Sequence, residues 1–151
     1  DFSHTERVLK LALHIGRVEN ADLEILELAS LLHDIARKYQ DESNGKICHA
    51  EKGAEMAKEI LKERGYPQEK IEKISNCILT HRYRDNKKPE TKEAEILYDA
   101  DKLDAIGAIG LARAFMFAGN IGADIHNPNV DIEKTEEYTK DETAYTEFLV
   151  K

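Results

Sequence analysis

Six histidine and aspartate side chains, spread over the first two thirds of the chain, are the residues best suited to chemistry. They are an adjacent histidine–aspartate pair, three further histidines and one later aspartate: His4, His33, Asp34, His49, His81 and Asp101. Imidazole nitrogens and carboxylate oxygens are hard or borderline metal ligands, and no thiolate is needed to complete such a set. The pattern therefore favours one or two divalent ions that activate water.

The elements that must position these side chains are predicted to be helical almost throughout. Apolar residues recur at helical spacing over residues 5–18, 21–37, 49–64, 68–81 and 91–118, and again from residue 143. The second of these segments follows a candidate Asn20 cap and is apolar on most faces, as is typical of a buried central helix. Gly65 and Pro67 end the third. No strand pattern is present, so we expect an all-α bundle of about six helices in one domain, residues 1–151, whose last helix is incomplete.

Composition excludes several classes of protein. Of 151 residues, 41% are hydrophobic and 34% are charged, and the net charge of −8 comes without a basic cluster, which disfavours duplex nucleic acid as a partner. Neither a run of 18 apolar residues nor a charged-then-apolar leader occurs, so we expect no membrane span and no signal peptide. Two cysteines without a CxxC motif fit a reducing cytoplasm. A homodimer is compatible with the sequence, which does not fix the oligomeric state.

Two carboxylates interrupt an apolar stripe in the predicted helix over residues 91–118. The residues that share this stripe are Leu97, Asp101, Asp104, Ala108, Leu111 and Phe115. Burying an unpaired carboxylate costs several kcal/mol, so each needs a metal, a proton or a cation as its partner. A structural pairing with Lys102 or with an arginine elsewhere is the alternative to metal binding.

His81 extends a stripe of isoleucines at positions 71, 74 and 78, so its ring should face the core or a cleft. Cys77 lies four residues earlier and could form a cysteine–histidine pair with it. Because the sequence offers no second pair of this kind, a structural zinc site is not expected.

Other members of the set each have a structural alternative when they are considered singly. His4 could cap a helix that begins after it, His49 could be exposed at the start of a helix, and Asp34 could belong to a polar stripe. We assign no chemical role to His14, within a helix, or to His126, within a loop.

Taken in order, the motifs resemble those of the HD-domain superfamily of metal-dependent phosphohydrolases, which is named for a doublet like His33-Asp34. The matching stretches are SHTERV at 3–8, ASLLHDI at 29–35, HAEKGA at 49–54, ILTHR at 78–82 and DADKLDAIGAIGLAR at 99–113. The resemblance covers about residues 3–118 and is greatest to small, poorly characterised bacterial and archaeal members. It implies an HD-type helical bundle with a metal site in the helical core.

The resemblance also implies a ligand assignment. A first ion would be bound by four residues: His4, His33, Asp34 and Asp101. Asp34 would bridge to a second ion, which His49 and His81 would complete, although some similar chains lack a histidine at position 49. The ion would be Fe, Mn, Mg, Co, Ni or Zn.

The hypothesis that follows is hydrolysis of a phosphate ester in a nucleotide or another small phosphorylated metabolite. Asp34 and Asp104 are the candidate catalytic carboxylates, and Asp104, one turn beyond Asp101, would orient a group or transfer a proton. Four cations follow ligand positions closely and could bind the substrate's phosphate, or could equally be surface charges: Arg7, Lys52, Arg82 and Lys102.

Two alternatives of different classes stay open. Some HD-domain proteins with six similar ligands resemble di-iron oxygenases, and imidazole and carboxylate ligands suit iron as well as the other metals. A non-catalytic nucleotide-binding regulatory domain is the second alternative. The intact ligand set counts against it, because a degenerate site would normally lose at least one ligand.

Overall fold

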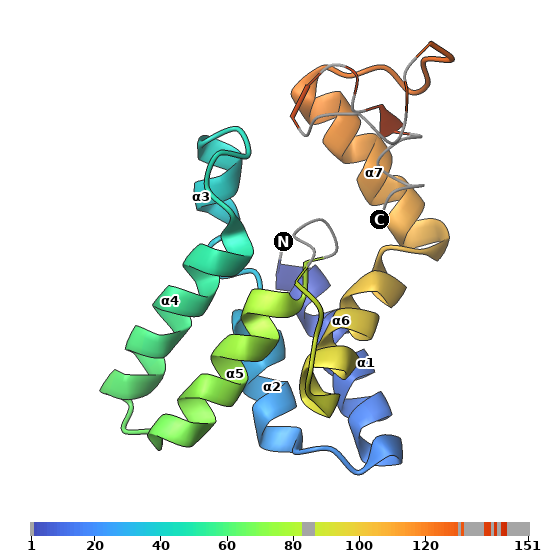
Figure 1. The fold of residues 1–151 in the computed structure, drawn as a ribbon. Helices are drawn as coiled ribbons and strands as arrows, with labels where there is room; N and C mark the ends of the chain where they lie inside the picture. The colour runs from blue at the N-terminus through green and yellow to red at the C-terminus, as the bar shows by residue number, and fades with distance from the viewer. Residues whose placement is uncertain are drawn as a thin grey trace. The chain divides into compact units, whose positions relative to one another are not determined.

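The computed structural model describes residues 2–82 and 87–129, together with 131, 138, 139, 141, 143 and 144. Helices alone make up the regular structure of these residues, so the all-α prediction is confirmed (Figure 1). The helices are α1 (Phe2–Glu19), α2 (Leu23–Leu32), α3 (Arg37–Glu42), α4 (His49–Glu63), α5 (Gln68–Thr80), α6 (Lys92–Asp104) and α7 (Gly107–Ile121). Across the described ranges, no helix is long and apolar enough to span a membrane.

The chain divides into two compact units, residues 1–101 and 102–151. The prediction of one domain over residues 1–151 stays a prediction. In the first unit α1 packs on α2, α2 on α5, and α4 on α5. Their apolar stripes meet in a core whose fully buried members include Val8, Leu26, Leu61, Ile74, Ile78 and Leu97.

The antiparallel pair α4 and α5 determines where the chemistry can lie. A tight turn joins these helices, and Gly65 occupies it with φ +78°, a left-handed conformation that glycine adopts without a steric penalty. Gly65 and Pro67 thus end the helix as predicted. The first residue of α4 and the last residue of α5 consequently lie at the same end of the pair (Figure 1).

The central helix is shorter than the apolar pattern predicts. α2 ends at Leu32, the next four residues form a turn, and α3 begins at Arg37, so one helix over residues 21–37 is wrong. The N-terminal cap is Asp22, whose carboxylate accepts hydrogen bonds from the backbone N–H groups of Glu24 and Ile25 at 3.0 and 3.2 Å. The predicted cap, Asn20, instead has φ 53° in the turn before it.

The predicted helix over residues 91–118 is also two helices. α6 ends at Asp104, and α7 begins at Gly107 with φ +74° and continues to Ile121. A Cβ atom at Gly110 would lie 1.9 Å from the carbonyl oxygen of Ala105, so glycine permits the chain to fold closely at this break. The single apolar stripe across residues 97–115 is therefore wrong, because the helix that would carry it is interrupted. The helix predicted from residue 143 lies outside the described residues beyond Ala144.

Candidate metal centre

All six predicted ligands are described, and the first compact unit brings them together. They form two groups of three in which the candidate ligand atoms lie within 4.8 Å of one another: His4, His33 and Asp101, and Asp34, His49 and His81. All four histidines are buried, with 0–4% of each residue exposed. A cluster of this composition comes from residues up to 97 positions apart in sequence, so only the fold can assemble it.

Helix ends supply most of these side chains. His49 is the first residue of α4, and His81 directly follows α5, so the shared end of that helix pair presents both rings. His33 caps the C-terminus of α2, and Asp34 follows in the turn. His4 is not before the first helix, as the cap alternative required, but is a buried residue within α1.

The first group is built from α1, the turn after α2, and α6. The Nε2 atom of His4 lies 3.2 Å from Nε2 of His33 and 3.3 Å from Oδ1 of Asp101. The two rings meet edge to face with centroids 5.2 Å apart. Three ligand atoms from three elements therefore point at one place.

In the second group, His49 Nε2 lies 3.1 Å from His81 Nε2 and 3.4 Å from Oδ1 of Asp34. The other oxygen of Asp34, Oδ2, lies 3.7 Å from Nε2 of His4 and 3.9 Å from Nε2 of His33. One carboxylate thus faces both groups, with a different oxygen toward each.

Hydrogen bonds on the far side of three rings determine which nitrogen is available as a ligand. The Nδ1 atom of His33 lies 2.7 Å from the carbonyl oxygen of Ser30, and that of His81 lies 2.6 Å from the carbonyl oxygen of Ile78. His49 Nδ1 lies 2.5 Å from Oε1 of Gln40. Carbonyl and amide oxygens only accept hydrogen bonds, so Nδ1 holds the proton in each neutral ring and Nε2 holds a lone pair.

This donor set fits a metal ion. The lone pairs of His49 Nε2 and His81 Nε2 face each other at 3.1 Å, an arrangement that is repulsive unless a proton or a metal ion lies between them. Two nitrogens each bound at about 2.1 Å to one ion are about 3.0–3.4 Å apart for angles of about 90–110°. The observed separation falls within that range.

The electrostatics keep three of the candidate ligands in the protonation state that metal binding requires. Burial, helped by the neighbouring His81 ring, lowers the pKa of His49 to about 2, and burial and His33 lower the pKa of His81 to about 4. Burial alone would raise the pKa of Asp34, but His33, His49 and Arg37 outweigh it and hold that pKa well below its usual range. At neutral pH, both imidazoles are therefore neutral and the carboxylate is charged.

Two arginines act electrostatically on the second group. Arg37 and Arg82 both lower the pKa of His49, so their guanidinium charges lie near it. Arg82 is half-buried, and its Nη1 lies 3.6 Å from Sγ of Cys48. The sequence pattern indicated Arg82 as a candidate phosphate contact but did not indicate Arg37. The position of Arg37, three residues after Asp34, is the feature of the sequence that could have indicated its proximity to the site.

The other predicted substrate-binding residues have varied surroundings. Arg7 is half-buried in α1, one turn after His4. Lys52 forms an ion pair with Glu55 at 3.2 Å. Lys102 is half-buried in the second compact unit.

Asp104 also belongs to the second unit, where it has a structural partner. Its side chain is 4% exposed, and Oδ2 lies 2.9 Å from Nη1 of Arg113. This is the neutralisation by an arginine that the sequence left open, and it accounts for the buried carboxylate. The catalytic role of Asp104 stays a prediction.

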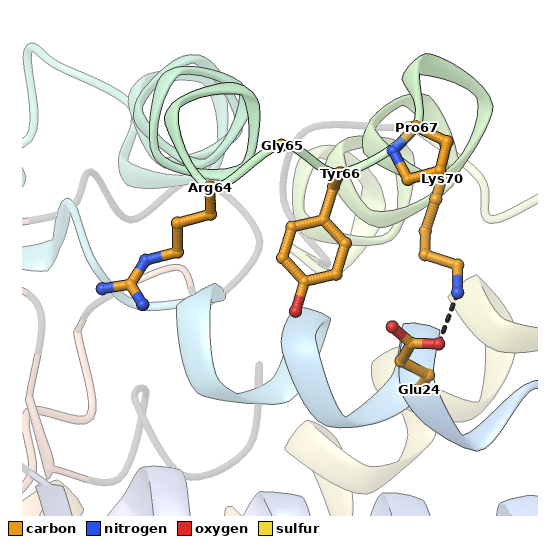
Figure 2. A pocket seen from close by; sticks show the side chains of 6 residues that line it. All are labelled: Glu24, Arg64, Gly65, Tyr66, Pro67 and Lys70. Atoms are coloured by element: carbon orange, nitrogen blue, oxygen red, sulfur yellow. Dashed lines mark hydrogen bonds and ion pairs between the residues drawn. The ribbon is translucent and has the colours of Figure 1, made fainter.

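A surface pocket of about 530 Å³ lies at the opposite end of the α4 and α5 pair from the histidines. Figure 2 shows it beside the turn between these helices, where Lys70 reaches Glu24 of α2 and Arg64 and Tyr66 line the remainder. Fifteen residues of α4 separate its two ends, which is about 22 Å at 1.5 Å per residue. The pocket is therefore separate from the metal-ligand candidates.

Comparison with known protein families identifies the fold family. The sequence model of the HD domain matches residues 1–106. The chain belongs to the HD-domain family. The resemblance to the HD-domain superfamily that the sequence motifs indicated is confirmed. The matched region contains all six candidate ligands.

The relatives are bacterial proteins of the same family. The chain is 34% identical over 156 residues to the uncharacterized protein YpgQ of Bacillus subtilis, an alignment that covers 100% of this chain and 67% of YpgQ. The crystal structure of a predicted HD superfamily hydrolase from an uncultured Thermotogales bacterium matches with a TM-score of 0.67 and 38% identity, over 80% of this chain and 65% of that one. A crystal structure of YpgQ in complex with ADP matches with a TM-score of 0.69 and 32% identity, over 99% of this chain and 66% of YpgQ. The chain therefore spans about two thirds of the length of these relatives.

Proposed function

We propose that this HD-domain chain is a metal-dependent phosphohydrolase that acts on a nucleotide or another small phosphate ester through metal-activated water. The observation that carries the proposal is the position of Asp34. Its Oδ1 lies 3.4 Å from His49 Nε2, while its Oδ2 lies 3.7 Å from His4 Nε2. A carboxylate shared in this way can hold two ions side by side, which is the arrangement used to clamp a phosphoryl group during displacement.

The ligand roles follow from the two groups. His4, His33 and Asp101 would hold one ion, His49 and His81 the other, and Asp34 both. Ions held there would lower the pKa of a water molecule and polarise a phosphoryl oxygen. The protein's own contribution is to present the neutral imidazoles of His49 and His81 and the ionised Asp34 carboxylate at fixed separations, so little reorganisation precedes binding.

Recognition of an anionic substrate is assigned to cations near the second group. Arg37 and Arg82 lie close enough to His49 to lower its pKa, and a guanidinium group can donate two parallel hydrogen bonds to a phosphate. The crystal structure of YpgQ with ADP supports a nucleotide as the substrate class. Arg7, Lys52 and Lys102 remain further proposed contacts for phosphate.

The proposed second catalytic carboxylate is Asp104, which would orient a group or transfer a proton if its ion pair with Arg113 opens. We also propose a cytoplasmic location. Cys48 and Cys77 are not joined in a disulfide, which fits a reducing compartment. A homodimer stays a prediction.

A substrate screen with metal analysis tests the proposal. The purified protein, prepared with and without oxygen, would be assayed for bound metals and then for turnover of nucleotides, phosphomonoesters and phosphodiesters with Mn²⁺, Fe²⁺, Co²⁺ and Mg²⁺. We expect hydrolysis that Asp34→Ala and His33→Ala abolish and that His14→Ala, an exposed histidine of α1, leaves unchanged.

Other outcomes would contradict hydrolysis and identify the alternative. Tightly bound iron with oxygen consumption, and no phosphate ester turnover, would indicate an oxygenase. Nucleotide binding without turnover under every metal condition would indicate a regulatory domain. Failure of the folded protein to bind any divalent metal would refute the proposal as a whole.

A further inference from the structure

Gln40 is a buried polar residue that no sequence pattern marks, and it lies against a candidate metal ligand. It is 2% exposed and belongs to the short helix α3. Its Oε1 atom lies 3.1 Å from the backbone nitrogen of His49 and 2.5 Å from Nδ1 of the same residue. One side-chain oxygen therefore contacts both the main chain and the ring of His49.

The backbone contact determines which end of the Gln40 amide faces His49. A backbone N–H only donates, so the amide group must present its oxygen and not its nitrogen. That oxygen can only accept from Nδ1, so the neutral His49 ring must be protonated there. The lone pair is then on Nε2, which faces His81 and Asp34.

Gln40 also compensates for a weak start to α4. Cys48, the residue that caps this helix, makes no side-chain hydrogen bond to it. The Gln40 oxygen accepts from a backbone N–H of the first turn, which has no partner within the helix. The same contact thus fixes both the beginning of α4 and the orientation of the ring on its first residue.

The other two rings of known orientation do not depend on a side chain. His33 and His81 donate to the backbone carbonyl oxygens of Ser30 and Ile78, three residues earlier, which any amino acid at those positions would supply. Among the histidines whose Nδ1 partner is described, His49 alone relies on a residue that substitution can remove. Of these three rings, the one whose orientation depends on a replaceable side chain therefore belongs to the second ligand group.

We propose that Gln40 is a positioning residue that holds His49 in the Nδ1–H tautomer and thereby sets the metal affinity of the Asp34, His49 and His81 group. The inference rests on the proposed function, because it concerns the second ion of that site. Outer hydrogen-bond partners of this kind fix ligand orientation, and their loss typically lowers metal affinity about 10–100-fold.

The test compares Gln40→Leu, which keeps the size but removes the acceptor, with Gln40→Glu, which keeps an oxygen in place. Metal content and affinity would be measured by calorimetry and elemental analysis with Mn²⁺ and Zn²⁺. Nitrogen NMR of the imidazoles in the metal-free protein would report the tautomer of His49. We expect Gln40→Leu to weaken one of the two ions about 10–100-fold and to populate the Nε2–H tautomer, while Gln40→Glu restores both properties.

The results separate this inference from the proposed function. If Gln40→Leu kept wild-type affinity for both ions and an unchanged His49 tautomer, the positioning role would be refuted while phosphohydrolase activity could stand. If the wild-type chain bound metal without hydrolysing any phosphate ester, the function would fail while the affinity and tautomer changes would still test Gln40. A purely structural role would lower stability without moving the tautomer, which would also overturn the proposal. Should Gln40→Leu not fold, Gln40→Met provides a second side chain without a comparable acceptor.

Discussion

The metal-free protein should lose stability steeply as the solution is mildly acidified, because the native site holds two histidines neutral. The pKa values of His49 and His81 fall from 6.5 to about 2 and about 4, respectively. Between these values and 6.5, the unfolded chain binds more protons than the folded one, so stability rises with pH in this window. Above pH 6.5 neither group contributes, and below it each destabilises the fold.

The magnitude follows from the ordinary histidine pKa and hardly depends on the exact native values. Lowering the pH from 6.5 to 5.5 protonates most unfolded copies of each imidazole, which costs about 1 kcal/mol per group and about 2 kcal/mol for both. Asp34 adds nothing in this interval, because the stability from its lowered pKa is lost only below its ordinary value of 3.8. A loss of about 2 kcal/mol is a large fraction of the total of about 5–15 kcal/mol for a typical domain.

Urea unfolding of the EDTA-treated protein, followed by circular dichroism at pH 7.5, 6.5 and 5.5, measures this effect. His81→Asn should roughly halve the pH dependence, since it removes one titrating group and one cause of the low pKa of His49. His14→Asn is the matched control on an exposed histidine and should leave the pH dependence unchanged. A free energy of unfolding that stayed constant within about 0.5 kcal/mol from pH 6.5 to 5.5 would refute the reasoning.

Three further predictions concern the ions and the surrounding charges. A divalent ion present at a free concentration of 100 times its dissociation constant should raise the free energy of unfolding by about 2.7 kcal/mol for each ligand group that it fills. A melting temperature that does not change when Mn²⁺ is added would contradict this. Arg113→Met should destabilise the fold by about 1–3 kcal/mol, because it removes the cation that is paired with the buried Asp104 carboxylate, and adding Asp104→Asn should recover most of the loss. Arg37→Met should raise KM for a nucleotide substrate about 10-fold, whereas the exposed Lys58→Met should change it less than about 2-fold. The metal content of the Arg37→Met and Lys58→Met variants should equal that of the wild-type protein, which checks that the Arg37 substitution affects only substrate binding.

Much of the site was predictable because polar residues occupy positions on helical faces that are otherwise apolar. His81 continues an isoleucine stripe, so helical spacing alone indicated that its ring turns inward, and it is 2% exposed. Asp101 follows the buried Leu97 by one helical turn. Both residues lie within α6, so the spacing argument holds although this helix ends at Asp104. These local arguments needed no knowledge of how the helices pack.

Features that depend on a turn between two helices could not be predicted from helical spacing. The apolar run through Leu32 and Ile35 reads as one helix, yet the chain turns there, and this turn is what lets Asp34 face both ligand groups. The break before Gly107 separates two helices whose sequence pattern is continuous. Gln40 escaped notice because its contact with His49 crosses a turn, and a lone glutamine in a polar segment has no distinctive pattern.

The number of divalent ions bound per chain tests the shared role of Asp34 most directly. Elemental analysis after dialysis against Mn²⁺ or Zn²⁺ should find two ions on the wild-type chain, one for each ligand group. His49→Ala should reduce this to one, whereas Asp34→Asn should weaken both ions, because its two oxygens face different groups. Two ions that survive Asp34→Asn with unchanged affinity, or no ion on the folded wild-type chain, would contradict the account.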